Sequence, residues 1–194
     1  MQNNFQSLSY FLPELLIIFT VLFVVISDLV NDLKKYTYYT ALFGLACSGL
    51  LVFIGGYTST PTMIFNDMLI FDSFSYYFKC IILFSTLSII LISKYSKELD
   101  DEYRAEYNTL LLIILLGMFL MTNSINLVMI YLSLELVSIP SYVLAGILKN
   151  DKKSNEASLK YVIFGSFASG LMLFGFSLLY GLTGTLNIYE IHDM

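Results

Sequence analysis

The stretch LLLIILLGMFLM at residues 110–121 decides the fold class, because it is apolar without interruption. A membrane-spanning strand is short and alternates apolar with polar residues, so an unbroken apolar run favours a helix. In lipid the backbone must satisfy its own hydrogen bonds, and a helix does so within one segment. The composition agrees, since 57% of the 194 residues are hydrophobic and only 13% are charged, whereas a soluble domain has about 25% charged residues.

Six apolar runs approach or exceed the ~20 residues that a spanning helix needs. We therefore predict an all-α integral membrane protein with about six transmembrane helices. The first three helices and their loops occupy residues 1–106, and the last three occupy residues 107–194. The expected spans are Tyr10–Val30, Tyr38–Tyr57, Ser73–Ile92, Tyr107–Thr122, Ile125–Leu148 and Ala157–Leu182.

Local signals indicate where some of these helices begin and end. Pro13 and Glu14 are suited to the first turn of the first helix, where a carboxylate complements the helix dipole. Ser154 resembles the N-cap of the sixth helix, and Gly184 marks its end. Thr58–Phe71 mixes apolar with polar residues and is expected to lie along the outer surface. No Lys or Arg precedes the first apolar run, so we interpret it as a retained helix rather than a signal peptide.

The basic residues predict the orientation of the helices. Lys and Arg cluster between the first and second, the third and fourth, and the fifth and sixth helices, and neither occurs in the other loops or the terminal tails. By the positive-inside rule, the three basic loops face the cytoplasm or matrix, and both termini face the outer side.

The composition argues against several functions. Cys47 and Cys80 form no spaced cluster that would bind a metal or an iron–sulfur centre, and His192 is the only histidine. A haem held between two histidines cannot be built from this chain, so any electron transfer must occur in another polypeptide. The net charge of −5 does not suggest nucleic-acid binding.

A carboxylate stands inside the fifth apolar run, in YLSLELVSIPSY at residues 131–142. Glu135 lies about ten residues into the helix, or about 15 Å at 1.5 Å per residue, which is close to mid-bilayer. An ionisable group at that depth suggests a function. Helical spacing places the hydroxyl-bearing side chains Tyr131, Ser138 and Tyr142 on its face. The opposite side is expected to carry Leu132, Leu136, Val137, Ile139 and Val143.

Pro140 adds a further polar group to this helix. It has no N–H, so the carbonyl of Leu136 loses its usual helical partner. Together with the carboxylate and the hydroxyls, that carbonyl can organise a chain of waters that conducts protons. The alternative is a protonated Glu135 that is hydrogen-bonded between helices, with Pro140 as an ordinary kink.

Two lysines lie within the apolar runs. Position alone favours extension of the Lys160 and Lys79 side chains to the membrane surface, with the ammonium group in water. The depths of Lys160 and Glu135 differ by about 10 Å, estimated from the helix rise, so water rather than a direct ion pair would link them. Gly165 and Ser169, four residues apart, indicate close packing of the sixth helix.

Four segments together resemble subunit N, called subunit 2 in mitochondria, of respiratory complex I, the NADH–quinone oxidoreductase. The resemblance covers nearly the whole chain and is strongest from Asn126 to Thr185. Sister subunits of complex I and cation/proton antiporters share the carboxylate helix. The segments are LPEL at 12–15, DSFSYYFK at 72–79, NLVMIYLSLELVSIPSYVLAG at 126–146 and SNEASLKYVIFGSFASGLMLFGFSLLYGLTGT at 154–185.

The resemblance implies proton translocation driven by quinone reduction elsewhere in an enzyme complex. It implies that Glu135 is a key carboxylate of the proton path and that Lys160 lies in or beside that path. Quinone, flavin and iron–sulfur clusters are expected in partner subunits, with no cofactor in this chain. The expected location is the inner membrane of a bacterium, with the mitochondrial inner membrane as the alternative.

The family has about fourteen helices, including two inverted five-helix repeats, and its seventh helix carries the lysine that pairs with the glutamate. This sequence is expected to hold only the first six helices. Its partners would be other membrane-arm subunits of complex I and a second chain that carries the seventh helix onward. Without that cation, Glu135 is expected to be protonated. A truncated fragment, a non-pumping membrane scaffold and a cation/proton antiporter component remain alternatives, and the choice of ubiquinone or menaquinone stays open.

Overall fold

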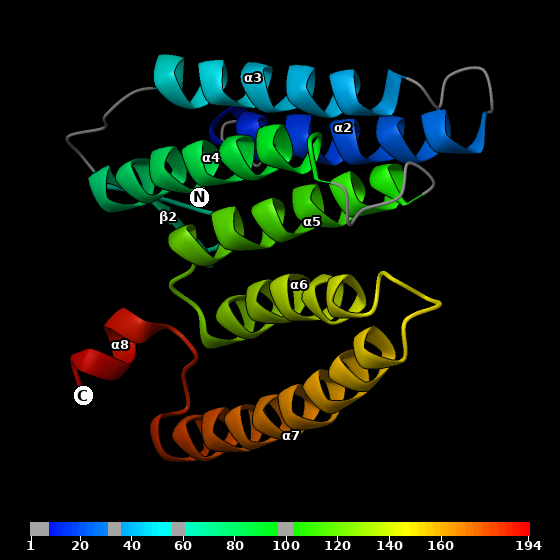
Figure 1. The fold of residues 1–194 in the computed structure, drawn as a ribbon. Helices are drawn as coiled ribbons and strands as arrows, with labels where there is room; N and C mark the ends of the chain where they lie inside the picture. The colour runs from blue at the N-terminus through cyan, green and yellow to red at the C-terminus, as the bar shows by residue number, and fades with distance from the viewer. Residues whose placement is uncertain (1–7, 31–35, 56–60, 97–102) are drawn as a thin grey trace.

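The computed structural model describes residues 8–30, 36–55, 61–96 and 103–194, and six long helices dominate it (Figure 1). All six are long enough and apolar enough to cross a membrane, which confirms the prediction of six spans. Their bounds are α2 (Leu12–Leu29), α3 (Thr37–Gly55), α4 (Ser73–Ser93), α5 (Arg104–Asn123), α6 (Leu127–Ala145) and α7 (Lys152–Thr183).

The largest differences from the expected bounds lie at helix ends that extend beyond the apolar run. α7 begins at Lys152 because Asp151 caps it, accepting a hydrogen bond from the backbone N–H of Lys153 at 3.0 Å. The prediction that Ser154 is the N-cap is wrong. Ser154 lies inside α7, and its hydroxyl donates to the carbonyl of Ala145 at 2.8 Å. The end at Gly184 is confirmed, with the left-handed φ of 69° that a helix C-cap favours.

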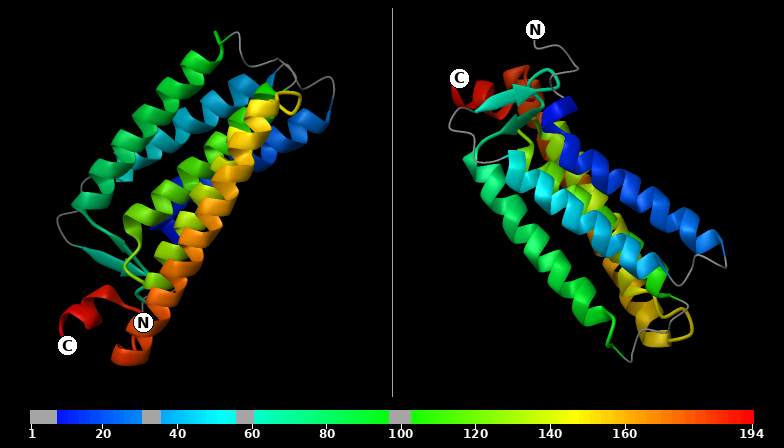
Figure 2. Two further views of the ribbon diagram at one scale, coloured as in Figure 1. Left: turned by 60° about the horizontal axis from the view of Figure 1, so that its bottom comes forward. Right: turned by 90° about the horizontal axis from the view of Figure 1, so that it is seen from above.

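A short β-hairpin closes one end of the bundle. It pairs β1 (Thr62–Ile64) with β2 (Leu69–Phe71) in antiparallel register. The short helix α8 (Ile188–His192) lies at the same end, and the N–H of Ile188 donates to the carbonyl of Ile125 at 2.9 Å (Figures 1 and 2). The segment expected along the outer surface is therefore this hairpin, except for residues 58–60, which lie outside the described residues.

At the other end lie the last turns of α2 and α4, the first turns of α3 and α5, and the connection between α6 and α7 (Figure 1). The guanidinium of Arg104 ties α4 to α5 there, with Nη1 donating to the carbonyls of Ser93 at 2.8 Å and Lys94 at 3.0 Å. The ammonium of Lys149 lies 3.5 Å from the carboxylate of Glu106. Basic residues thus gather at one end of the bundle, although the side of the membrane that this end faces remains a prediction.

α5 is the central helix of the bundle. One side packs against α2, α3 and α4, and the other side packs against α6. Gly117 permits the second contact, because a Cβ there would lie 2.8 Å from a methyl group of Val137 and 3.1 Å from the backbone of α6. The side chains buried among α2 to α5 form an apolar core of Ile17, Val24, Leu45, Ile90, Leu112, Leu115 and Phe119. α7 packs against α6 and buries none of its residues completely.

Candidate functional site

Glu135 lies midway along α6 and is half-buried. Its Oε1 is shielded from solvent and has no hydrogen-bond partner among the described residues. A buried polar atom without a partner is costly, so natural proteins supply one from protein or water. Oε1 is therefore placed to accept a hydrogen bond from water or from a group outside the described residues.

Tyr142 and Ser138, both expected on the face of Glu135, make contacts with other groups. Tyr142 is buried against α7, where its ring meets that of Tyr161 edge-on, with centroids 4.7 Å apart. A Cβ on Gly165 would lie 2.0 Å from the Tyr142 hydroxyl, so only glycine fits opposite this ring. Ser138 donates to the carbonyl of Leu134 within α6, at 2.8 Å.

The face of α6 that holds Glu135 is only partly covered. Residues three and four positions apart are neighbours on a helix, so Leu132 and Ile139 flank Glu135 on the adjacent turns. They are 53% and 56% exposed. The expectation that they lie opposite the carboxylate is wrong, whereas Val137 does pack away from it, against Gly117 of α5. Glu135 therefore borders an exposed apolar stripe, which also includes Val143.

Lys160 is exposed on α7, and its ammonium lies 2.5 Å from Oε1 of Glu156, one helical turn away. The hydroxyl of Ser158 donates to the carbonyl of Tyr142 at 2.8 Å, which sets the level of α7 against α6. Tyr142 is seven residues from Glu135, or about 10 Å along the helix axis. Lys160 lies two residues further along the antiparallel α7, so its depth differs from that of Glu135 by about 7 Å. The structure pairs its ammonium with Glu156 instead.

Lys79 does not extend to the membrane surface, and that prediction is wrong. Its side chain is 4% exposed, and its Nζ lies 2.6 Å from Oε1 of Glu14 on α2. The ammonium lies 4.1 Å from the ring centroid of Phe71 and 5.5 Å from that of Phe119, an arrangement that favours a cation. Asn123 of α5 donates from Nδ2 to the same Glu14 oxygen at 3.3 Å.

The sequence held a signal for this pair. Glu14 and Lys79 are a carboxylate and an ammonium, each within an apolar run and near the same end of the bundle. An ionisable group in a membrane span commonly pairs with another. The helix order alone did not show that α2 and α4 both contact α5, and this arrangement brings the two groups together.

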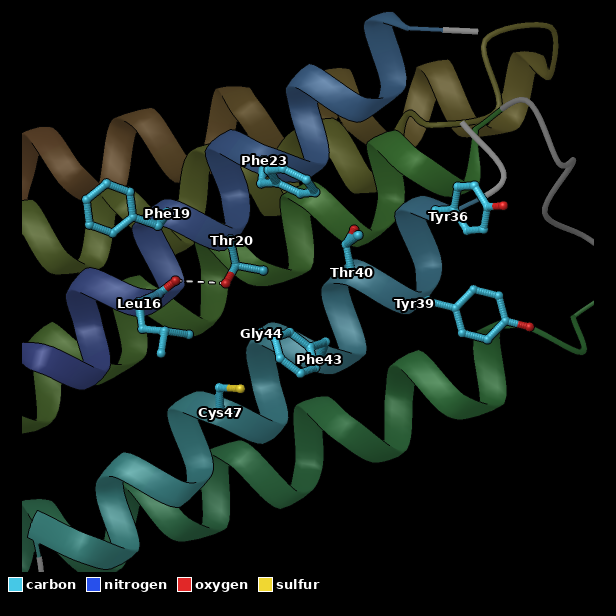
Figure 3. Close-up of a pocket in the computed structure, with 10 residues that line it drawn as sticks. All are labelled: Leu16, Phe19, Thr20, Phe23, Tyr36, Tyr39, Thr40, Phe43, Gly44 and Cys47. Atoms are coloured by element: carbon cyan, nitrogen blue, oxygen red, sulfur yellow. Dashed lines mark hydrogen bonds between the residues drawn. The ribbon is translucent and has the colours of Figure 1, made fainter. Parts of the chain in front are cut away.

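A pocket of about 620 Å³ lies between α2 and α3, away from both charged sites (Figure 3). Aromatic side chains surround it, and the described residues of its lining include no Asp, Glu, Lys or Arg. Its hydroxyl at Thr20 already donates to the carbonyl of Leu16 at 2.7 Å. Across the described residues, no group of three or more His, Cys, Asp or Glu is arranged to hold a metal ion.

The last part of the chain, from Ser124 onward, matches a known transmembrane family. Residues 124–194, which include α6 and α7, match the family described as the NADH:quinone oxidoreductase/Mrp antiporter transmembrane domain. Over these residues the chain is therefore similar to antiporter-like membrane proteins. Within that class, the chain resembles the N-terminal portion of subunit N of NADH-quinone oxidoreductase.

Two curated relatives carry that resemblance across nearly the whole chain. Subunit N of an Anaeromyxobacter species is 39% identical over 193 residues, covering 97% of this chain and 37% of the relative. Subunit N 2 of Chloroherpeton thalassium is 43% identical over 190 residues, covering 95% and 37%. The chain therefore spans little more than a third of the length of these relatives.

Two solved structures share the fold. A chain of respiratory complex I from Thermus thermophilus with bound aureothin matches with a TM-score of 0.71 and 25% identity, over 89% of this chain and 38% of its own length. A chain of an archaeal membrane-bound sulfane sulfur reductase matches with a TM-score of 0.79 and 20% identity, over 97% and 40%. The second match supports the fold alone.

Proposed function

We propose that this chain forms part of a proton-translocating membrane subunit of an NADH–quinone oxidoreductase, and that Glu135 carries the proton in α6. The observation behind the proposal is the partnerless Oε1 of Glu135, shielded inside a membrane-spanning helix. The relatives are subunits of an enzyme complex, so the chain would contribute to an enzyme without holding a redox centre itself.

Chemically, a half-buried carboxyl beside an uncovered apolar stripe suits a proton carrier. Further helices that cover Leu132 and Ile139 would also enclose Glu135. In such surroundings a carboxyl binds a proton, and the approach of a cation stabilises the ionised form instead. A positive charge that approaches Glu135 would therefore release its proton, and withdrawal of that charge would allow a proton to bind again.

The neighbouring residues would have supporting roles. Tyr131 and Ser138 would supply hydroxyls on the face of Glu135, and Tyr142 would position α7 through its close approach to Gly165. Pro140 interrupts the hydrogen-bond ladder of α6. Lys160 would relay a proton through water, since its ammonium is paired with Glu156 and not with Glu135.

The proposed setting is the inner membrane of a bacterium, with both termini on the outer side. The partners would be other membrane-arm subunits, and quinone, flavin and iron–sulfur clusters would reside in those partners. A C-terminally tagged chain, purified in mild detergent from its native cells, should bring complex I subunits with it in mass spectrometry. Recovery of the chain without any such subunit would contradict the assignment.

The proton role requires its own test in an assembled complex. Glu135→Gln should abolish or strongly reduce proton translocation per NADH oxidised, measured in proteoliposomes with a pH-sensitive dye. The matched control is Glu156→Gln, which removes an exposed carboxylate on α7. Unchanged proton stoichiometry in an assembled Glu135→Gln complex would exclude the proposed role and favour a membrane scaffold.

One observation favours a second candidate function. The family that matches residues 124–194 includes Mrp antiporters in its description, so a cation/proton antiporter component is possible. Transport of Na⁺ or K⁺ against a proton gradient, in vesicles that lack an NADH oxidase, would identify it. Proton movement that depends on NADH oxidation and not on these cations would exclude it.

A further inference from the structure

A second site inside the membrane helices combines three polar side chains from three helices. Glu14 of α2 and Asn123 of α5 are each 0% exposed, and Lys79 of α4 is 3% exposed. It lies near the hairpin end of the bundle, whereas Glu135 lies midway along α6. The side chains are held by close contacts, with Lys79 2.6 Å and Asn123 3.3 Å from the same Glu14 oxygen.

The hydrogen bonds of this site leave two acceptor oxygens without a partner among the described residues. Oε1 of Glu14 accepts from both Lys79 and Asn123. Oε2 of Glu14 and Oδ1 of Asn123 are buried and have no partner among the described residues. Both atoms are acceptors while Glu14 is ionised, so neither can satisfy the other.

A proton on Oε2 would satisfy both atoms at once. The protonated oxygen would donate to Oδ1 of Asn123, while Nδ2 of Asn123 continues to donate to Oε1. A carboxylic acid and a carboxamide pair in this way through two hydrogen bonds in one ring. The site therefore provides partners for both states of Glu14: Lys79 stabilises the carboxylate, and Asn123 stabilises the acid.

A pocket of about 380 Å³ connects Lys79 with the hairpin end of the bundle. It is far larger than the ~10–15 Å³ that one water molecule requires. Tyr10, Asp72 and Tyr76 are the other titratable groups in its lining, and α3 contributes only apolar side chains and Gly55. Asp72 is engaged at the start of α4, where it accepts from the N–H and hydroxyl of Ser75. Lys79 is thus the group through which pocket water reaches Glu14.

We propose that Glu14, Lys79 and Asn123 form a proton-binding site that exchanges with water at the hairpin end of the bundle. The ammonium of Lys79 passes one proton along its hydrogen bond to Oε1 of Glu14, leaving a neutral amine and a neutral acid. A half-turn of the carboxyl group about its Cγ–Cδ bond then exchanges its two oxygens, so that the protonated one faces Oδ1 of Asn123 and the other accepts from Nδ2. The amine then takes one proton from a hydronium ion in the pocket, which becomes water. The site gains one proton and one positive charge, and the reverse steps release the proton.

This site is independent of Glu135 and of the function proposed for it. A purely structural ion pair would instead keep Glu14 ionised at every pH at which the protein is folded. The protonation state of Glu14 in the folded protein therefore decides between the two interpretations.

The test is solid-state NMR of the full chain in lipid bilayers, with glutamate labelled by ¹³C at the carboxyl carbon. One signal, absent in Glu14→Gln, should convert reversibly from carboxylate to carboxylic acid as the pH is lowered. The same signal should remain in Glu135→Gln and Glu156→Gln, which serve as controls. If Glu14→Gln does not fold, the double change Glu14→Gln with Lys79→Met replaces the pair by neutral side chains and allows the same assignment.

The result that overturns the proposal is a Glu14 signal that stays in one protonation state over the whole pH range of the folded protein. The route is tested separately with Gly55→Phe, because a side chain there has open space and would fill the pocket. Hydrogen–deuterium exchange at the protonated Glu14 carboxyl should slow in this variant. Gly170→Phe, which also meets open space but lies on α7, should leave that rate unchanged. Equal rates in the two variants would exclude the pocket as the route.

Discussion

Lys79→Met tests how far the buried ion pair stabilises the fold. The variant keeps a similar side-chain volume but leaves the Glu14 carboxylate without its cation, at a site where Glu14 is 0% exposed. Removal of one partner from a buried pair costs about 3–5 kcal/mol, because the remaining charge stays desolvated. We expect a loss of unfolding free energy within that range at neutral pH, where Asn123 is the only other side chain bonded to Glu14 among the described residues.

The assay is an SDS titration in mixed micelles, followed by far-ultraviolet circular dichroism. Lys94→Met is the matched control, since Lys94 is exposed and its ammonium contacts Tyr38 with 4.8 Å to the ring centroid. Loss of an exposed cation–π contact costs about 0.5–1 kcal/mol. Equal losses of unfolding free energy in Lys79→Met and Lys94→Met would refute the argument that the buried pair stabilises the fold because it is buried.

A double variant locates the cause of the loss. Glu14→Gln combined with Lys79→Met should recover most of the unfolding free energy, because a neutral pair of similar volume leaves no buried charge. A double variant that is no more stable than Lys79→Met would indicate disrupted packing instead.

The remaining predictions concern the glycines of the helix contacts. Gly117→Ala should lower the unfolding free energy by about 1–3 kcal/mol, because its Cβ would lie 3.1 Å from the backbone of α6. Gly170→Ala meets open space and should raise the unfolding free energy by up to about 1 kcal/mol, through the higher helix propensity of alanine. The same SDS titration compares the two, and equal effects would contradict the close α5–α6 contact. Gly165→Leu should separate α7 from α6, because its side chain would overlap the ring of Tyr142. Added Tyr142→Ala should restore the contact, measured by the distance between spin labels on the two helices, and no restoration would show that this overlap is not the cause.

Hydropathy predicted the six spans well, because the cost of exposing apolar side chains acts on each segment separately. It placed helix ends less well where polar residues continue the helix into water. The capping by Asp151 and the bond from Ser154 to Ala145 depend on how the chain turns between α6 and α7. A window of hydropathy contains no such information.

The carboxylate of α6 was found from sequence, because an acid within an apolar run is conspicuous and its depth follows from the helix rise. Its surroundings were predicted less well. Helical spacing itself places Leu132 and Ile139, three and four positions from Glu135, on the same face, so the expectation that they lie opposite misjudged the helical angles. Spacing does not show which face a neighbouring helix covers, and the exposed stripe beside Glu135 became visible only when α5 and α7 were in place.

The sequence by itself determined the class of protein, the number of spans and the alternation of basic loops, since each depends on local composition. Only the tertiary structure decided whether Lys79 reaches water or is buried in an ion pair. A lysine two turns into a helix can extend to water or pair within the bundle, and the choice depends on which side chains surround it. Here α2 brings Glu14, α5 brings Asn123 and the hairpin brings Phe71 to the same ammonium. Those groups are far apart in the chain, so the buried pair is a product of helix packing.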